Sequence, residues 1–236
     1  MLRTGLIIRF EGVWAGYDGP DVLQDVSFEV AEGEVAVVHG PTAAGKTTLI
    51  HMLRLALPPR AGVASLLGED IAKLNARRRA KLKRRIGYIG EEPTFVEDGT
   101  VFENVALPLR LAGQKRAAYA EDVDELLSFV GLADLADEEA RKLSFAERRR
   151  VAIARALAGK PAIILADEPA AGLSPEGAMR TFRLLAEMRR VGAAVIICTQ
   201  NEQYADGIEC QRWRMQQGRL TPDDDSAIFM DAESFT

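Results

Sequence analysis

Short apolar segments, several of them with alternating polar positions, predict a series of β-strands. Residues 6–13 and 22–30 have this pattern, and the segment between them is rich in glycine and proline, as in a turn. Residues 34–39 are nearly all apolar, which suits a strand buried on both faces of a sheet. Further strands are predicted at 62–67, 86–89, 163–167 and 194–199, with a terminal hairpin turning at Gln217 and Gly218.

Longer segments with a helical period separate these strands. A helix is predicted over 46–57, and Pro58 and Pro59 would end it. The segment 71–85 is predicted as a very basic helix, for which a solvated face is favoured over contact with anionic lipid headgroups. The other predicted helices cover 101–111, 118–130, 144–157 and 175–190. The helical block at about 90–160 interrupts the strand-rich part and resembles an insertion.

Composition indicates the domain organisation and gives no sign of nucleic-acid binding or of a membrane span. The 236 residues, 47% hydrophobic and 28% charged, suit one sizeable domain with an inserted subdomain. The net charge of −5 gives no overall attraction to nucleic acid. Every apolar run is shorter than the roughly 20 residues that span a bilayer, so membrane association is expected only through a partner. Two cysteines and two histidines without ligand spacing predict buried thiols and structural imidazoles.

A glycine-rich loop with the pattern G-x-x-x-x-G-K-S/T lies between the strand 34–39 and the helix after it. Such a loop converges backbone N–H groups and a helix N-terminus on phosphate oxygens. Lys46 would reach the β- and γ-phosphates of ATP, and Thr47 would bind Mg²⁺. Ala43 replaces a frequent glycine, which a negative φ would tolerate. The candidate nucleotide-binding residues of this segment are Gly40, Pro41, Thr42, Ala43, Ala44, Gly45, Lys46, Thr47 and Thr48.

A second apolar strand ends in two acids about 120 residues further along the chain. Asp167 is the candidate for the magnesium shell. Glu168 is the candidate general base that polarises the attacking water, because such a base must lie within one hydrogen bond of its target.

Together these motifs resemble ABC-type ATPases, most closely the cell-division ATP-binding FtsE family, with lipoprotein-release and macrolide-export ATPases next. The resemblance extends to about Leu220. The matching segments include 8–11, 23–28, 104–109, 151–156 and 165–169. It implies an α/β fold with a P-loop NTPase core, an N-terminal antiparallel β-subdomain and an inserted helical subdomain at about 90–160, within one domain over 1–220. An acidic tail over 221–236 is expected to be loosely ordered.

The same resemblance implies a head-to-tail dimer in which the signature segment of one subunit covers ATP on the other. Ser144 keeps its place in that signature and is expected to contact the γ-phosphate, but two glycines have become Phe145 and Ala146. A phenylalanine ring beside a triphosphate is bulky, so it must turn away or closure is poor. Tyr17 stands where the family stacks an aromatic ring on adenine.

Three switch positions also depart from the family pattern. Glu91 stands in place of a magnesium-binding glutamine and adds negative charge, while Gln200 replaces a histidine and cannot carry a positive charge. Ser174 replaces an aspartate that links the two sites. Arg148 or Arg149 is a candidate to offset the charge of Glu91. Slow hydrolysis, or ATP used mainly for assembly, is the expected consequence.

The resemblance finally implies partners. We expect a cytoplasmic ATPase, bound to the inner face of the cell membrane through an integral-membrane subunit of FtsX-like or permease type. A second nucleotide-binding subunit is expected, most simply an identical copy, and nucleic acid is not. Three alternatives stay open: a lipoprotein or small-molecule exporter, an ATP-gated regulatory subunit with little turnover, and a soluble DNA-associated relative, which the acidic charge disfavours.

Overall fold

Two β-sheets organise the computed structural model, which describes residues 5–223. Within these residues one sheet is antiparallel, with strand order β2-β1-β4-β5, and the other is six-stranded, with order β10-β9-β3-β8-β7-β6. Strands β9, β3, β8, β7 and β6 run parallel, and β10 pairs antiparallel with β9. The strands are β1 Leu6–Ala15, β2 Leu23–Ala31, β3 Val35–His39, β4 Ala61–Leu66, β5 Glu69–Asp70, β6 Ile86–Ile89, β7 Ile163–Asp167, β8 Ala194–Thr199, β9 Gln211–Gln216 and β10 Arg219–Pro222.

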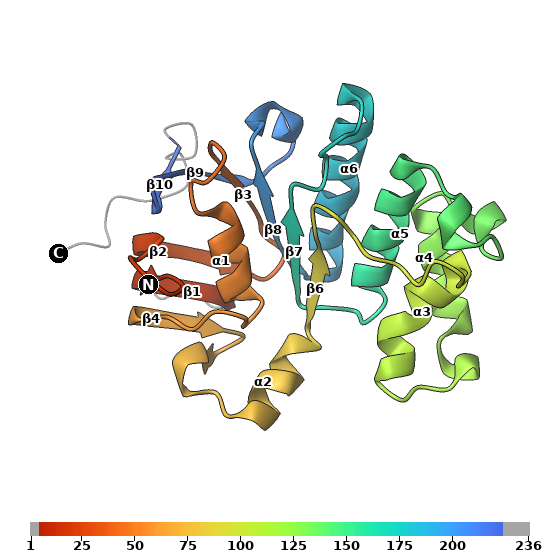
Figure 1. Ribbon diagram of the computed structural model, residues 1–236, viewed down its shortest axis with the longest axis horizontal. Helices are drawn as coiled ribbons and strands as arrows, with labels where there is room; N and C mark the ends of the chain where they lie inside the picture. The colour runs from red at the N-terminus through yellow and green to blue at the C-terminus, as the bar shows by residue number, and fades with distance from the viewer. Residues whose placement is uncertain (1–4, 224–236) are drawn as a thin grey trace.

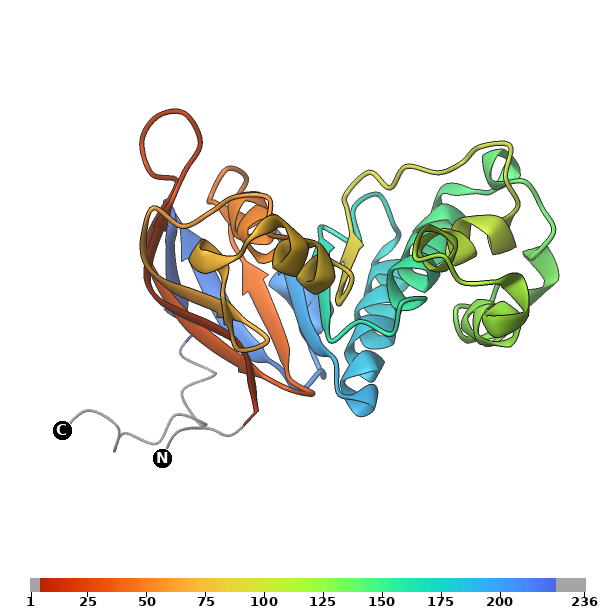
Figure 2. The same ribbon diagram turned by 90° about the horizontal axis from the view of Figure 1, so that it is seen from below.

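Helices cover both faces of the six-stranded sheet, as Figures 1 and 2 show. Helix α1 lies on the side of the antiparallel sheet, and α6 lies on the opposite side, next to a group formed by α3, α4 and α5. This group comes after β6 and before β7 in the chain, and Figure 2 shows it set off to one side of the sheets. The helices are α1 Lys46–Leu53, α2 Ala76–Lys83, α3 Val101–Leu111, α4 Ala120–Phe129, α5 Phe145–Leu157 and α6 Pro175–Glu187.

The alternation of side chains along β3 divides the core into two clusters. Ala36 and Val38 point into a cluster shared with β1, β2, β4 and α1. Val35 and Val37 point into a second cluster that contains α6 and continues into α3, α4 and α5. Because neighbouring residues of a strand face opposite sides, a strand buried on both faces must be apolar throughout. The apolar segment predicted at 34–39 therefore holds the two layers together.

The predicted fold class is confirmed, and the differences in the elements are local. Helix α1 ends at Leu53 rather than at residue 57, because Leu55 takes a left-handed conformation with φ 59. The predicted helix 71–85 is wrong in extent: a short 3₁₀ turn comes first, and Asn75 then caps the N-terminus of α2 by accepting a hydrogen bond from the Arg78 N–H at 2.9 Å. Asparagine favours such a cap over a helix interior.

The end of the chain is described only in part. Thr221 and Pro222 belong to β10, and the Asp223 N–H donates to the Arg212 carbonyl at 2.9 Å. The remainder of the predicted loose tail, 224–236, lies outside the described residues. Both cysteines are free thiols, but only Cys198 is buried; the predicted burial is wrong for Cys210, which is partly exposed. Among the helices over 5–223, none has the length and apolarity that crossing a bilayer requires.

The predicted turn at Gln217 and Gly218 is confirmed, and it contacts the glycine-rich loop. The Gly218 N–H donates to the Ala44 carbonyl at 2.9 Å, and the Gly218 carbonyl accepts from the Gln24 N–H at 2.9 Å. Gly218 has φ 79, and a Cβ there would lie 1.9 Å from the Val22 carbonyl oxygen. Only glycine fits this position, so the terminal hairpin supports the loop between β3 and α1.

We expect Gly218→Ala to lower the free energy of unfolding by about 2 kcal/mol or more, because a left-handed alanine and a backbone clash add together. Gly68→Ala is the matched control, since Gly68 has φ 78 with nothing within 4 Å of its added Cβ. For Gly68→Ala the expected loss in the free energy of unfolding is about 1 kcal/mol, the cost of a left-handed alanine alone. Urea unfolding of both variants measures the difference, and equal losses would contradict the role of the clash with Val22.

Candidate nucleotide and metal site

The loop after β3 is folded around the side chain of Lys46. Its ammonium donates to the carbonyl oxygens of Gly40 at 2.7 Å and Pro41 at 3.0 Å, and the residue is only 6% exposed. A Cβ on Gly40 would lie 2.1 Å from the Met215 carbonyl oxygen, so the loop passes very close to β9. Gly45 precedes α1 with φ 114 and without a side-chain cap, which leaves the N-terminal amides of α1 for a ligand. Such amides, with the helix dipole, bind phosphate.

Ala43 differs from the expectation. Its φ is 60, so the negative φ that would make alanine tolerable at this loop position is wrong. A left-handed conformation is strained for alanine, because its Cβ lies too close to the following carbonyl oxygen. The sequence carried a signal for this, since the family pattern has glycine at the same position.

Two acids lie at the end of β7, beside the loop. Asp167 is 5% exposed, and burial raises the pKa of its carboxyl, with Glu91 adding to the increase and a hydrogen bond from Thr47 opposing it. Glu168 is the next residue, with φ 45, a left-handed conformation that turns its side chain toward Lys46 and Gln200. Strained backbone of this kind persists where surrounding contacts hold it.

Glu168 is held between the loop and the end of β8. Its Oε2 accepts from the Gln200 N–H at 3.1 Å, and its Oε1 lies 3.5 Å from the Lys46 ammonium. Burial is the main cause that raises the pKa of its carboxyl, and the Gln200 N–H and Lys46 act in the opposite direction. A carboxylate whose pKa is raised is a better proton acceptor, as a general base requires.

Gln200 joins the loop through its side chain. Its Oε1 accepts a hydrogen bond from the Thr42 hydroxyl at 3.1 Å. Lys46, Asp167, Glu168 and Gln200, from three different elements, therefore meet at one edge of the sheet.

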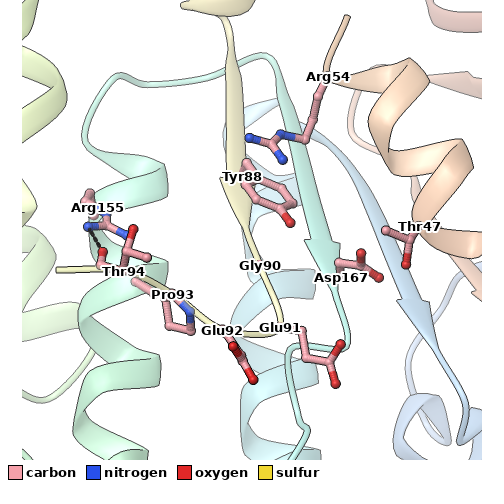
Figure 3. Close-up of a pocket in the computed structure, with 11 residues that line it drawn as sticks. Thr47, Arg54, Tyr88, Gly90, Glu91, Glu92, Pro93, Thr94, Arg155 and Asp167 are labelled. Atoms are coloured by element: carbon pink, nitrogen blue, oxygen red, sulfur yellow. Dashed lines mark hydrogen bonds between the residues drawn. The ribbon is translucent and has the colours of Figure 1, made fainter. Parts of the chain in front are cut away.

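Glu91 lies on the other side of Asp167. A cavity of about 420 Å³ is lined by Thr47, Glu91 and Asp167, and Figure 3 shows Arg54 and Tyr88 at one end of it. Carboxylate and hydroxyl oxygens are the ligands that Mg²⁺ prefers, so the donor set of Thr47, Asp167 and Glu91 fits that ion. The structure thus brings all three predicted metal ligands to one cavity.

Tyr17 lies on the loop between β1 and β2, about half exposed, and its hydroxyl forms a hydrogen bond of 2.6 Å with Nδ1 of His51 on α1. Arg60 donates to the Tyr17 carbonyl. This contact with His51 was not predicted, because the two residues are 34 positions apart and no local pattern links them.

His39 has a structural environment. Its Nδ1 lies 2.9 Å from Glu202 and its Nε2 lies 2.7 Å from Asp223. A single ion could bind only one of these two nitrogens, so the arrangement joins β3 to the segments after β8 and β10 and does not resemble a metal centre.

Ser144 lies apart from this group. It caps the N-terminus of α5 in a capping box, with its N–H and hydroxyl both donating to Glu147 at 2.8 and 2.6 Å, and it does not line the cavity of Thr47 and Asp167. Those bonds lower the pKa of the Glu147 carboxyl. Ser174 caps α6 without a capping box, its hydroxyl accepting from the Gly177 N–H at 3.2 Å.

We expect Ala43→Gly to raise the free energy of unfolding by about 1 kcal/mol, because glycine adopts φ 60 without strain. Ala44→Gly is the neighbouring control. Ala44 is buried and is not among the residues with positive φ, so the change should lower stability by about 1 kcal/mol through added backbone freedom and a lost methyl group. Thermal unfolding distinguishes the two, and a destabilised Ala43→Gly variant would contradict the assignment of strain.

The raised pKa of Glu168 predicts a pH dependence of stability. An ionised, buried carboxylate disfavours the folded state above its raised pKa, so metal-free Glu168→Gln should unfold at a higher temperature than wild type at neutral pH. The difference in unfolding temperature between variant and wild type should disappear as the pH falls through that pKa, since Glu168 then protonates. Glu147→Gln has the opposite sign, because the pKa of Glu147 is lowered: it should unfold at a lower temperature at neutral pH, and the loss should vanish in acid. A difference in unfolding temperature between Glu168→Gln and wild type that grows in acid would contradict the predicted pH dependence.

Comparisons with known proteins agree with this geometry. A family model described as "ABC transporter" matches residues 23–171. CbiO1 from Clostridium perfringens, part of the ABC transporter complex CbiONQ, is 27% identical, with a TM-score of 0.86, covering 95% of this chain and 91% of that chain. The ATP-binding cassette MJ0796, solved as a dimer in a post-hydrolysis state with ADP and Pi, is 25% identical, with a TM-score of 0.81, covering 92% and 98%.

A nucleotide-free ATP-binding cassette from an ABC transporter is 26% identical, with a TM-score of 0.77, covering 91% of this chain and 89% of that chain. The family match covers well over half of the 236 residues and includes both the glycine-rich loop and the strand that ends in Asp167. The chain belongs to the ABC transporter family and is an ATP-binding ATPase of that family.

Proposed function

We propose that this chain is the ATPase subunit of an FtsE-like complex, which binds Mg-ATP, dimerises around it and acts on an integral-membrane partner. The observation that carries the proposal is the meeting of Lys46, Glu168 and Gln200 at the carboxyl edge of the sheet. The FtsE-like part rests on the sequence resemblance in segments such as 104–109 and 165–169. The proposal includes one ATPase domain over 1–220, with a helical insertion at about 90–160.

Each residue has a role in that proposal. The amides of Gly40–Gly45 and the Lys46 ammonium hold the phosphates, and Tyr17 stacks on adenine. Thr47, Asp167 and Glu91 hold Mg²⁺, which neutralises charge on the phosphates. Glu168 accepts a proton from the attacking water, and Gln200 orients the γ-phosphate through an amide where the family has a histidine.

Ser144 does not line the cavity of its own subunit, and its role toward ATP held by a second copy rests on the resemblance of the signature segment. Phe145 is 52% exposed beside it. CbiO1 is part of a transporter complex, which supports assembly with other transporter subunits. MJ0796 was solved as a dimer, which supports assembly with a second cassette. We place the chain at the inner face of the membrane, held there by that subunit.

The replaced switch residues favour slow turnover. Gln200 brings no positive charge to the γ-phosphate, and Glu91 brings an additional negative one, so the developing charge of the transition state is less well compensated. An exporter of lipoproteins or small molecules would use the same site, and its membrane partner would differ.

The test is Mg-ATP turnover by the full chain, alone and with candidate membrane partners in nanodiscs. Glu168→Gln should lower turnover about 100-fold or more, because a general base contributes at least that much, and should trap an ATP-bound dimer in analytical ultracentrifugation. Glu125→Gln, on the exposed face of α4, is the control and should behave as wild type.

Stimulation by an FtsX-like subunit supports the FtsE-like role, and stimulation only by an export permease supports the exporter. Brisk turnover that survives Glu168→Gln would refute the proposed site. Tight ATP binding with a negligible rate in wild type and variant alike would indicate an ATP-gated regulatory subunit.

A further inference from the structure

One buried guanidinium links three segments of this ATPase. Arg149 on α5 is 3% exposed. It donates to the Gly90 carbonyl at 2.9 Å, just after β6, and to the Ala171 carbonyl at 3.3 Å, in the turn after Glu168. The first of these acceptors directly precedes Glu91 in the chain. Arg149 therefore holds the backbone on either side of the acids at the candidate metal site, from a helix that begins at Ser144.

The ring of Phe145 covers this guanidinium. The Arg149 Cζ lies 5.1 Å from the ring centroid, a distance at which a cation is attracted to an aromatic face. The ring also packs on Gly172, where an added Cβ would lie 2.9 Å from the Phe145 Cε1. The bulky residue in the signature thus turns toward its own subunit and closes the Arg149 site from outside.

Arg149 makes these contacts without an ion pair. No carboxylate of the described chain lies within 4.0 Å of its guanidinium, its Nε is buried without an acceptor, and Glu91 and Glu92 are the acids whose charge acts on it. A guanidinium buried this deeply, and bonded to carbonyl oxygens, loses hydration that no ion pair replaces. Its planar fork bonds the two carbonyls from two different nitrogens, whereas a lysine or a glutamine side chain has one donor nitrogen.

Helix α5 is also pressed against β6. A Cβ on Gly87 would lie 2.4 Å from the Ala156 carbonyl oxygen of α5. Helix α5 contacts β6 at Gly87 and, through Arg149, the segment after β6 at Gly90. A shift of the helix would therefore displace Glu91, the residue after Gly90. The position of Ser144 and the position of the Glu91 carboxylate are thereby connected through one rigid element.

We propose that Arg149 is a positioning residue for the metal face of the ATPase site, holding Glu91 and the turn after Glu168 in register with the Ser144 end of α5. This rests on the proposed role of Glu91 as a Mg²⁺ ligand. The positive charge also offsets Glu91, so that the additional carboxylate can face Mg²⁺ without repelling the phosphates. Arg149 acts through Gly90 and Glu91 and is not itself in contact with the reacting atoms.

The test is a Mg²⁺ titration of the binding of a fluorescent ATP analogue, because this readout does not need turnover. Arg149→Met removes both hydrogen bonds and should raise the Mg²⁺ concentration at half-saturation about ten-fold or more, the range found when groups that orient metal ligands are removed. Arg148→Met is the matched control. Arg148 is the adjacent residue, pairs with the exposed Glu97, and should leave the half-saturation point within about two-fold.

A double-mutant cycle separates positioning from general damage to the fold. Glu91→Gln should shift the Mg²⁺ dependence in wild type but add less than about two-fold in the Arg149→Met background, because Glu91 is already displaced there. If Arg149→Met does not fold, Arg149→Lys serves instead: it keeps the charge but has one donor nitrogen in place of the two that bond Gly90 and Ala171, and should give an intermediate shift that is likewise non-additive with Glu91→Gln.

Two results overturn the proposal: Mg²⁺ dependence in the folded Arg149 variant that matches wild type, or full additivity with Glu91→Gln. Either result would leave the proposed function intact, since wild-type binding would still depend on Mg²⁺. Wild-type binding without any Mg²⁺ dependence would instead refute the metal site itself, and the role of Arg149 with it.

Discussion

The ATPase site depends on the parallel pairing of β3, β7 and β8. Parallel strands end at the same edge of a sheet, so the segments that leave these strands are brought together without any further interaction. In this register His39 pairs with Thr199 and Asp167 with Cys198. The glycine-rich loop, Glu168 and Gln200 begin at or next to these strand ends. Loss of this register would separate the groups that the chemistry requires.

The strand pairing leaves little space at this edge of the sheet, so the surrounding backbone is closely packed and locally strained. The loop passes so close to β9 and to the terminal hairpin that Gly40 and Gly218 admit no side chain. Ala43 and Glu168 take left-handed conformations that only the neighbouring contacts maintain. Strain of this kind is typical of sites that hold a ligand through backbone groups, because the direction of each N–H matters more than local stability.

Charge at the site is arranged differently from the family pattern. In the proposed site, Glu91 adds a carboxylate to the metal face, and Gln200 brings no positive charge to the phosphates. Arg149, on the helix that Ser144 caps, carries a positive charge that interacts with Glu91. Phe145 is linked to Glu91 through Arg149, which contacts the Phe145 ring and donates to the carbonyl of Gly90, the residue before Glu91. Their effects are expected to depend on one another, since groups in one hydrogen-bonded network rarely act additively.

Local sequence patterns determined the fold class and the main motifs of this protein. The apolar segment at 34–39, the glycine-rich loop and the strand ending in Asp167 are short-range patterns whose physical cause lies within a few residues, and the α/β class could be predicted from them. The break at Asn75 was missed because capping competes with helix periodicity over a single residue.

Tertiary structure alone decided the rest. The φ of Ala43, the bond between Tyr17 and His51, and the inward turn of Phe145 over Arg149 depend on segments that are distant in sequence. No local propensity encodes which side chain will occupy the space above Gly172. That choice is made by close packing between layers, where the volume left by one segment determines the conformation of another.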